Sequence, residues 1–291
     1  MTSISPPRSM ASPSALTTPP TTVSPSDFEF LRNLLRSKSA IVLDDGKEYL
    51  VESRLAPVLR EAQIPTIRDL VQSLRGRNAA LEGKVVDAMT TNETSWFRDI
   101  HPFEAMRTSL LPELVEKRKS TREITIWCAA ASSGQEPYSL AMLIREHFPQ
   151  LAGWSVRILA TDLSPSMIER ARGGHYSQLE MNRGLPAAYL VKYFERVGAE
   201  WQVKSEIRSM VEYKLLNLAE PWPTMPALDM LFIRNVLIYF DRDTKRSIFQ
   251  NARKVLRSDG TLVLGSSETT FNIDDGWASR TIGKAILYTP Q

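Results

Sequence analysis

Small and acidic residues follow two apolar, β-branched runs that have the character of buried strands. The run Ile124–Ala129 leads into the small residues 130–134, and the run Val156–Thr161 leads into Asp162. In an open parallel sheet, ligands bind outside the carboxyl ends of the strands, where small residues let them approach the backbone. An acid ~20–30 residues beyond the first turn can accept hydrogen bonds from two ribose hydroxyls. The spacing therefore indicates a nucleoside-bearing ligand, although a tight turn after the first run and a helix cap at Asp162 would explain the same residues.

The loop after the first run lacks the pattern of dinucleotide-binding enzymes. Gly134 is the only glycine in Ala130-Ala131-Ser132-Ser133-Gly134, whereas the phosphate turn of that fold uses G-x-G-x-x-G. A nicotinamide dehydrogenase is therefore disfavoured.

A second polar cluster, Asn92-Glu93-Thr94-Ser95-Trp96-Phe97-Arg98-Asp99, stands where a helical pattern gives way to alternating strands and helices. It combines an amide, two hydroxyls, two large aromatic rings and a guanidinium, and domain junctions are favoured places for ligand sites. The alternative is that Trp96 and Phe97 anchor the core while Arg98 forms a local salt bridge.

The elements that must position these residues begin with a helical unit, residues 27–91. Its signals are a cap at Ser26 or Asp27, a second helix over 44–62 bent by Pro57, a cap at Thr66, and the four-residue spacing of Leu81, Val85 and Met89. These signals predict a small all-helical domain.

Beyond Asn92, strands and helices alternate, which predicts a doubly wound α/β domain over residues 92–291. The expected parallel strands are Ile124–Ala129, Val156–Thr161, Val211–Leu216, Met230–Ile233 and Leu262–Leu264, and the expected helices between them are Glu136–His147, Pro165–Arg172 and Thr244–Leu256. A last strand, Ala285–Thr289, should return antiparallel beside Leu262–Leu264, because no helix-length crossover separates the two.

One connection, from Arg172 to Val211, is too long for a simple crossover. Its pattern indicates a helix over Pro186–Phe194 and short strands at Trp201–Val203 and Ile207–Met210. These elements predict a small β insertion at about residues 195–211.

Composition limits the class of protein. The 291 residues include 36 Lys and Arg against 33 Asp and Glu, a net charge of +3, which gives no reason to expect nucleic acid as a partner. Cys128 is the only cysteine, and three scattered histidines together with it cannot form a structural zinc site, so no metal is expected.

No apolar run approaches the ~20 residues of a membrane span. A soluble cytoplasmic protein without direct membrane insertion is expected, preceded by a disordered Ser/Thr/Pro-rich tail over Met1–Ser26.

Four motifs in register resemble one family. They are Asn92 to Asp99, Trp127-Cys128-Ala129-Ala130-Ala131-Ser132-Ser133-Gly134-Gln135-Glu136-Pro137-Tyr138-Ser139, Ala160-Thr161-Asp162, and Arg234-Asn235-Val236-Leu237-Ile238-Tyr239-Phe240-Asp241. Together they resemble the chemotaxis receptor glutamate methyltransferases, the CheR family, over about residues 27–290. The resemblance implies a Rossmann-like S-adenosylmethionine methyltransferase domain with an inserted antiparallel β-subdomain, preceded by a small all-α domain.

The resemblance also implies which residues form the site. By position in the motifs, the residues that contact S-adenosylmethionine, or its product S-adenosylhomocysteine, are Asn92, Thr94, Arg98, Glu136, Asp162 (on the ribose), Asn217 and Leu218 (by the adenine), and Arg234 and Asn235 (on the pocket floor). Two departures, Trp96 in place of a common Phe and Gln135 in place of a common acid, leave these ligands untouched.

The implied reaction needs little acid–base chemistry. A glutamate side chain with an unperturbed pKa of ~4.3 is mostly ionised at neutral pH and can attack the methyl group without a base. The enzyme must hold the reacting atoms in line, and Arg98 and Tyr239 are the residues expected to orient the substrate carboxylate.

The implied partner is the cytoplasmic helical region of methyl-accepting chemoreceptors, which stand in membrane-bound arrays. The enzyme itself is expected to be a monomer. Lys47 and Arg54, seven residues apart, could form a docking face on the helical unit or a plain solvated surface. The short run Tyr193–Val203, with Gly198 its only glycine, predicts methylation that does not depend on a receptor C-terminal pentapeptide.

The alternatives are a non-catalytic regulator that binds S-adenosylmethionine or S-adenosylhomocysteine, and a methyltransferase for a small molecule or RNA. A methyltransferase for RNA would show a basic stripe.

Overall fold

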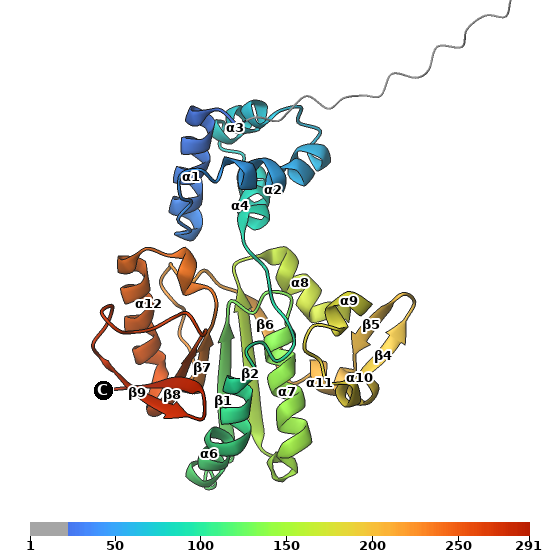
Figure 1. The fold of residues 1–291 in the computed structure, drawn as a ribbon, viewed down its shortest axis with the longest axis vertical. Coiled ribbons are helices and arrows are strands. Elements are labelled where there is room, and N and C mark those ends of the chain that lie inside the picture. Colours follow the sequence, from blue (N-terminus) through green and yellow to red (C-terminus); the bar gives the residue numbers. More distant parts are fainter. Residues whose placement is uncertain (1–22) are drawn as a thin grey trace, which may run out of the picture.

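The computed structural model describes residues 23–291, which form a helical domain joined by a single linker to an α/β domain (Figure 1). The helices of the first domain are α1 (Pro25–Ser39), α2 (Glu48–Glu61), α3 (Ile67–Arg75) and α4 (Ala79–Met89). Their apolar faces share one core that includes Leu35, Leu55 and Leu70. Thr66 caps α3 by accepting the Asp69 N–H, as the sequence predicts, and the exposed Pro57 lies inside α2.

The start of this domain corrects the predicted tail. Residues 1–22 lie outside the described residues. Val23 is 6% exposed and packs in the helical core, and Ser24, instead of Ser26 or Asp27, caps α1 by accepting the Asp27 N–H. The tail boundary at Ser26 is therefore wrong. A proline in the first turn does not delay a helix, because its missing N–H would have no partner there anyway.

The α/β domain is built on a seven-stranded sheet in the order β6-β2-β1-β7-β8-β10-β9. Its strands are β1 (Glu123–Ala129), β2 (Ser155–Asp162), β6 (Val211–Leu215), β7 (Leu228–Ile233), β8 (Leu256–Leu264), β9 (Trp277–Ile282) and β10 (Ala285–Pro290). The first five are parallel where they pair, at the positions that the apolar runs predict. Strand β10 pairs antiparallel with β8, which confirms the predicted return of the chain.

Helices cover both faces of this sheet. Ile126 and Cys128 of β1 share a core with α7 (Gln135–His147) and α8 (Pro165–Gly173), whereas Trp127 and Ala129 share another with α12 (Arg242–Val255). This alternation along one strand is that of a three-layer, doubly wound domain, and it confirms the predicted fold class.

A helical stretch before β1 was not predicted. It runs through α5 (His101–Ala105), a π-helical turn (Met106–Leu110) and α6 (Leu111–Lys117), with Pro112 in its middle. The Leu111 N–H bonds back to the Met106 carbonyl, and this wider turn stands just before the proline that lacks a donor. A proline inside the pattern hides such a helix from sequence reasoning.

The insertion forms a second, antiparallel sheet in the order β3-β5-β4. It comprises β3 (His175–Tyr176), β4 (Phe194–Val197) and β5 (Glu200–Val203), with α9 (Gln178–Met181), α10 (Ala187–Tyr193) and α11 (Ser205–Arg208). The predicted start at about residue 195 is too late, since β3 already belongs to this sheet. The predicted strand Ile207–Met210 is wrong: Ile207 lies in α11, and two apolar residues three apart fit a helical turn as well as a strand.

Two short 3-10 helices, Pro149–Leu151 and Leu237–Tyr239, complete the described structure. None of the helices in residues 23–291 combines the length and apolar character needed to cross a bilayer.

Candidate functional site

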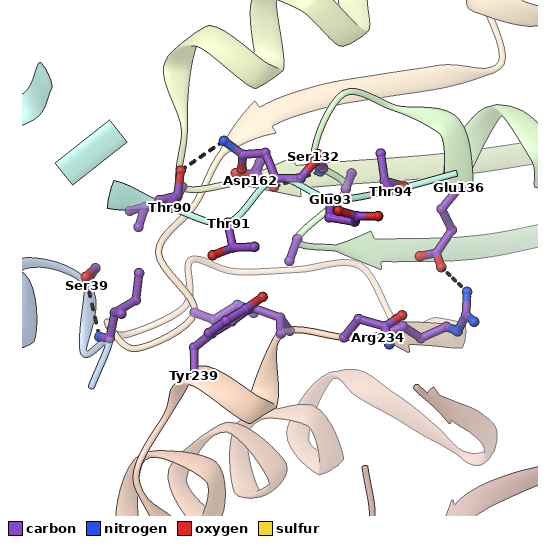
Figure 2. A pocket seen from close by; sticks show the side chains of 18 of the residues that line it. Ser39, Thr90, Thr91, Glu93, Thr94, Ser132, Glu136, Asp162, Arg234 and Tyr239 are labelled. Atoms are coloured by element: carbon purple, nitrogen blue, oxygen red, sulfur yellow. Dashed lines mark hydrogen bonds and ion pairs between the residues drawn. The ribbon is translucent and has the colours of Figure 1, made fainter. Parts of the chain in front are cut away.

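The two domains enclose one pocket at the carboxyl ends of the parallel strands. It contains about 880 Å³ of space, part of it open to solvent. Every residue that the sequence assigned to the site lines it: Asn92, Thr94, Arg98, Glu136, Asp162, Asn217, Leu218, Arg234, Asn235 and Tyr239. Figure 2 shows the paired Glu136 and Arg234 at one end of the pocket and Ser39 and Thr90 at the other, with Asp162 along the upper side and Tyr239 on the lower side.

Asp162 ends β2 with its carboxylate held by backbone donors. One oxygen accepts the Ser132 N–H at 2.8 Å and the other accepts the Ser164 N–H at 2.9 Å. Burial raises the pKa of Asp162, and these N–H groups oppose that rise. Each oxygen keeps acceptor capacity for a ligand hydroxyl. The alternative role as a helix cap does not hold, because Ser164 caps α8.

The loop after β1 approaches the ligand space in a strained conformation. Ala130, Ser132 and Gly134 have φ values of 59°, 50° and 95°. Only glycine fits at the last of these positions, because a Cβ there would lie 2.7 Å from the Tyr213 hydroxyl oxygen. Positive φ at non-glycine residues costs energy and gathers at ligand sites. The Gly134 N–H also donates to the Ala131 carbonyl at 3.0 Å, so the loop is a tight turn, and its residues Ala131 and Ser132 line the pocket.

Two contacts brace this loop from other parts of the chain. The Ser132 hydroxyl donates to the Asn92 carbonyl at 2.8 Å, which joins the loop to the linker. The Tyr176 hydroxyl, from β3 of the insertion, donates to the Ser133 carbonyl at 2.6 Å. No sequence pattern points to Tyr176, since its contact depends on the insertion folding back onto the loop.

Arg234 and Glu136 form a buried ion pair on the pocket floor. The Arg234 Nη1 donates to Glu136 Oε2 at 2.6 Å, and its Nη2 donates to Asp99 Oδ2 at 2.9 Å and to the Arg98 carbonyl at 2.8 Å. Burial raises the pKa of Glu136, and Arg234 opposes that rise. With its guanidinium 1% exposed and shared among three acceptors, Arg234 organises the floor. Asp99 is the partner that sequence reasoning missed.

Arg98 has a different environment. Its Nη1 donates to the Glu93 carbonyl at 2.7 Å, its side chain is partly exposed, and it forms no ion pair with any residue in the described part of the chain. The alternative of a local salt bridge is therefore not met there, and Arg98 lines the pocket. The neighbouring aromatic residues do anchor the core: Trp96 packs edge-on against Tyr176 and Phe194, with ring centroids 4.8 and 5.3 Å apart.

The helical domain supplies one side of the pocket. Ser39, the last residue of α1, and Ile41, which follows the helix, line it together with Thr90 and Thr91 of the linker. Asn217 Nδ2 donates to the Lys38 carbonyl at 2.9 Å, which fixes this segment beside the predicted adenine position. Nothing in the local pattern around Ser39 indicates a ligand, so sequence reasoning missed it.

No metal centre is evident in the described structure. Within residues 23–291, no three of His, Cys, Asp and Glu gather in a way that could hold a metal ion.

Comparisons with known proteins agree with this architecture. Residues 26–90 match the family described as "CheR methyltransferase, all-alpha domain", and residues 92–283 match "CheR methyltransferase, SAM binding domain". The chain is 43% identical over 268 residues to chemotaxis protein methyltransferase 1 of Pseudomonas aeruginosa, covering 90% of this chain and 97% of the relative.

Other relatives agree. The chain is 39% identical over 271 residues to the chemotaxis protein methyltransferase of Vibrio parahaemolyticus, covering 92% of this chain and 98% of the relative. It is 38% identical over 268 residues to chemotaxis protein methyltransferase Cher2 of Pseudomonas putida, covering 90% and 97%. With both domains matched and the pocket between them, the chain belongs to the CheR family of S-adenosylmethionine-dependent methyltransferases.

Proposed function

We propose that this protein transfers a methyl group from S-adenosylmethionine to glutamate side chains of chemoreceptors, giving glutamate methyl esters and S-adenosylhomocysteine. The observation that carries the proposal is the convergence of all the predicted site residues on one interdomain pocket, with Arg98 and Tyr239 among them. The names of the relatives, chemotaxis protein methyltransferases, support the same pathway.

The cofactor roles are those that the family resemblance implies, and they are supported by the fact that all of these residues line one pocket. Asp162 would hold the ribose hydroxyls, Asn217 and Leu218 would lie by the adenine, and Glu136 would face the amino-acid end. Asn92, Thr94 and Arg98 would close over the cofactor from the linker, with Arg234 and Asn235 beneath it. The pocket is lined by enough apolar surface, including Leu163, Leu216 and Phe240, to bury a nucleoside.

Methyl transfer here is catalysis by positioning. When bound, S-adenosylmethionine would supply a sulfonium-activated methyl group, which would pass to a substrate carboxylate oxygen while the electron pair of the broken C–S bond stays on sulfur. Arg98 has free donors that can hold the target carboxylate in line, and the Tyr239 hydroxyl can give it a second contact. Because Arg234 already donates hydrogen bonds to Glu136 and Asp99, it does not compete for that carboxylate.

A groove beside the pocket supports a helical substrate. It is lined from both domains, among others by Leu35, Val42, Lys47, Leu50 and Ile238, and it shares Ile41, Thr91 and Tyr239 with the cofactor pocket. The groove carries Asp44 as well as the cations Lys47 and Arg54, and an amphipathic helix would dock there with its apolar face in the groove and an acidic residue at Lys47. Lys47 is the cation we assign to docking, whereas Arg54 braces the linker by donating to the Met89 carbonyl at 2.6 Å and to Thr91 Oγ1 at 2.8 Å.

Independence from a receptor C-terminal pentapeptide is a further part of the proposal. The connection between β4 and β5 contains only Gly198 and Ala199, because Val197 pairs directly with Glu200. Such a tight turn offers little backbone for gripping a peptide. Selection would then rest on the interdomain groove, with the protein acting as a cytoplasmic monomer recruited to receptor arrays. Titration of receptor C-terminal peptides tests this: micromolar binding that disappears when residues 194–203 are altered would contradict it.

The central experiment incubates the protein with methyl-labelled S-adenosylmethionine and chemoreceptor cytoplasmic fragments, then locates the label by mass spectrometry. We expect base-labile methyl esters on glutamates of the receptor helices. Fragments whose target glutamates are replaced by alanine are the matched control and should remain unlabelled. Tight S-adenosylhomocysteine binding without any transfer to receptors would overturn the proposal in favour of a non-catalytic regulator.

A further inference from the structure

Glu268, in the turn after β8, places both carboxylate oxygens against backbone donors of two segments. Its Oε2 accepts the N–H groups of Asn235 and Gly265, each at 2.8 Å. Its Oε1 accepts those of Val236 at 2.9 Å and Leu237 at 2.8 Å. A side chain that binds successive N–H groups of a distant loop restrains that loop far more than a surface glutamate would.

The loop that Glu268 holds has a conformation that needs support. Asn235 has a φ of 59°, in the left-handed region, and Val236 follows at −126°. This turn aims the N–H groups of three successive residues in one direction, which makes a concave site for an anion. The Glu268 carboxylate fills it.

Close packing shows that the arrangement is specific. A Cβ on Gly265 would lie 2.7 Å from Glu268 Oε2 and 2.9 Å from the Asn235 nitrogen. Glycine at this position therefore lets the turn after β8 press against the loop after β7. Any larger residue would displace the carboxylate from its donors.

The same loop carries residues of the pocket. Asn235 and Val236 line it directly, and Leu237 begins the 3-10 helix that ends at Tyr239. The position of the Tyr239 hydroxyl thus depends on where the three N–H groups are fixed. Glu268 itself does not line the pocket.

We propose that Glu268 is a positioning residue for methyl transfer, which sets the placement of Tyr239 by binding the N–H groups of residues 235–237. The effect on rate rests on the proposed function, whereas the effect on the loop does not. Glutamine at this position is nearly isosteric, but its amide nitrogen would face two N–H donors instead of accepting from them.

The test compares Glu268→Gln with Glu116→Gln, an exposed glutamate that only approaches Lys119 at 3.8 Å. In Glu268→Gln we expect the methyl-transfer rate to fall on the order of 10²-fold, as for a misplacement of about 1 Å, with a much smaller change in the Kd for S-adenosylhomocysteine. In a Tyr239→Phe background the same change should cost little more, because both variants remove one interaction. Independent, multiplicative losses would overturn the proposal.

Hydrogen exchange gives a readout that needs no receptor. Amides in peptides covering residues 234–239 should exchange faster in Glu268→Gln than in Glu116→Gln, and unchanged protection would overturn the proposal. If the wild-type protein transfers no methyl to receptors, the proposed function fails while exchange still decides the role of Glu268. Should Glu268→Gln not fold, Glu268→Asp, which keeps the charge but shortens its reach, replaces it with the same expected directions and the same contradicting result.

Discussion

The floor of the cofactor pocket and its roof are held by different kinds of contact. The floor, formed by Glu136, Asp162 and Arg234, consists of charged groups that are buried and bonded to one another or to the backbone. The roof, formed by Ser39 and Ile41 of the helical domain, is held by interdomain hydrogen bonds, such as the Val42 N–H to the Tyr239 carbonyl at 2.9 Å, and by the packing of Ile41 against the apolar core of the α/β domain. The floor is therefore held by buried charged contacts, whereas the roof is held by apolar packing and hydrogen bonds.

Within residues 23–291, one ion pair joins the two domains near the roof, and it illustrates the difference. Arg36 meets Asp241 at 3.2 Å with side chains 66% and 36% exposed, whereas Arg234 meets Glu136 at 2.6 Å with side chains 1% and 11% exposed. An exposed pair contributes about 0–1 kcal/mol, whereas removing one partner of a buried pair costs roughly 3–5 kcal/mol. The floor should therefore tolerate substitution far less than the roof.

The largest effect is expected from breaking the floor pair. Arg234→Met leaves the Glu136 carboxylate buried without its partner and should lower the free energy of unfolding by about 3–5 kcal/mol, measured by urea denaturation. Combining it with Glu136→Gln removes both charges and should restore part of the loss. If the double variant is less stable than Arg234→Met, the pair is not the source of the effect.

Arg98 and Arg234 line the same pocket, but substitutions at the two arginines should have different effects. Arg98→Ala should leave stability nearly unchanged but reduce methyl transfer on the order of 10²-fold, because the carboxylate loses its orienting donors. Single-turnover rates and S-adenosylhomocysteine calorimetry separate the two steps. Equal losses in rate and in binding would make Arg98 a cofactor ligand only.

A substitution at Asp162 tests whether the floor binds the cofactor in addition to stabilising the fold. Asp162→Ala should weaken S-adenosylhomocysteine binding by about 1–3 kcal/mol through lost charged hydrogen bonds, measured by calorimetry. Glu169→Ala, on the exposed side of α8, serves as the matched control. Unchanged affinity in a folded Asp162→Ala protein would remove Asp162 from the ribose site.

The smallest effect is expected at the roof. Arg36→Ala should change the free energy of unfolding by at most about 1 kcal/mol and become indistinguishable from wild type at high salt. Denaturation at two ionic strengths measures this. A loss of the size expected for Arg234→Met would mean that the roof is as firmly built as the floor.

The sequence predicted the parts of the fold whose signals are local. Buried parallel strands give uninterrupted apolar runs, and β1, β2 and β7 match those runs closely. Strand β9 was missed, because only Trp277 in it is buried and its remaining residues have no apolar pattern.

The candidate site divides in the same way. Asp162 was found because it directly follows a strand, and the other motif residues were found by resemblance. Ser39 and Glu268 were missed, because each acts through a tertiary contact: the three N–H groups that Glu268 binds in residues 235–237 lie 31–33 positions away in the chain. No spacing rule covers such a contact.

The shared pocket has a consequence for how the molecule melts. A ligand that touches Asp162 below and Ser39 above would add contacts between two domains that already meet through Ile41 and a set of polar contacts. Ligand binding stabilises whatever must stay folded to bind it. We therefore expect the helical domain and the α/β domain to unfold in one transition when the cofactor is bound, and in less closely coupled transitions when it is absent.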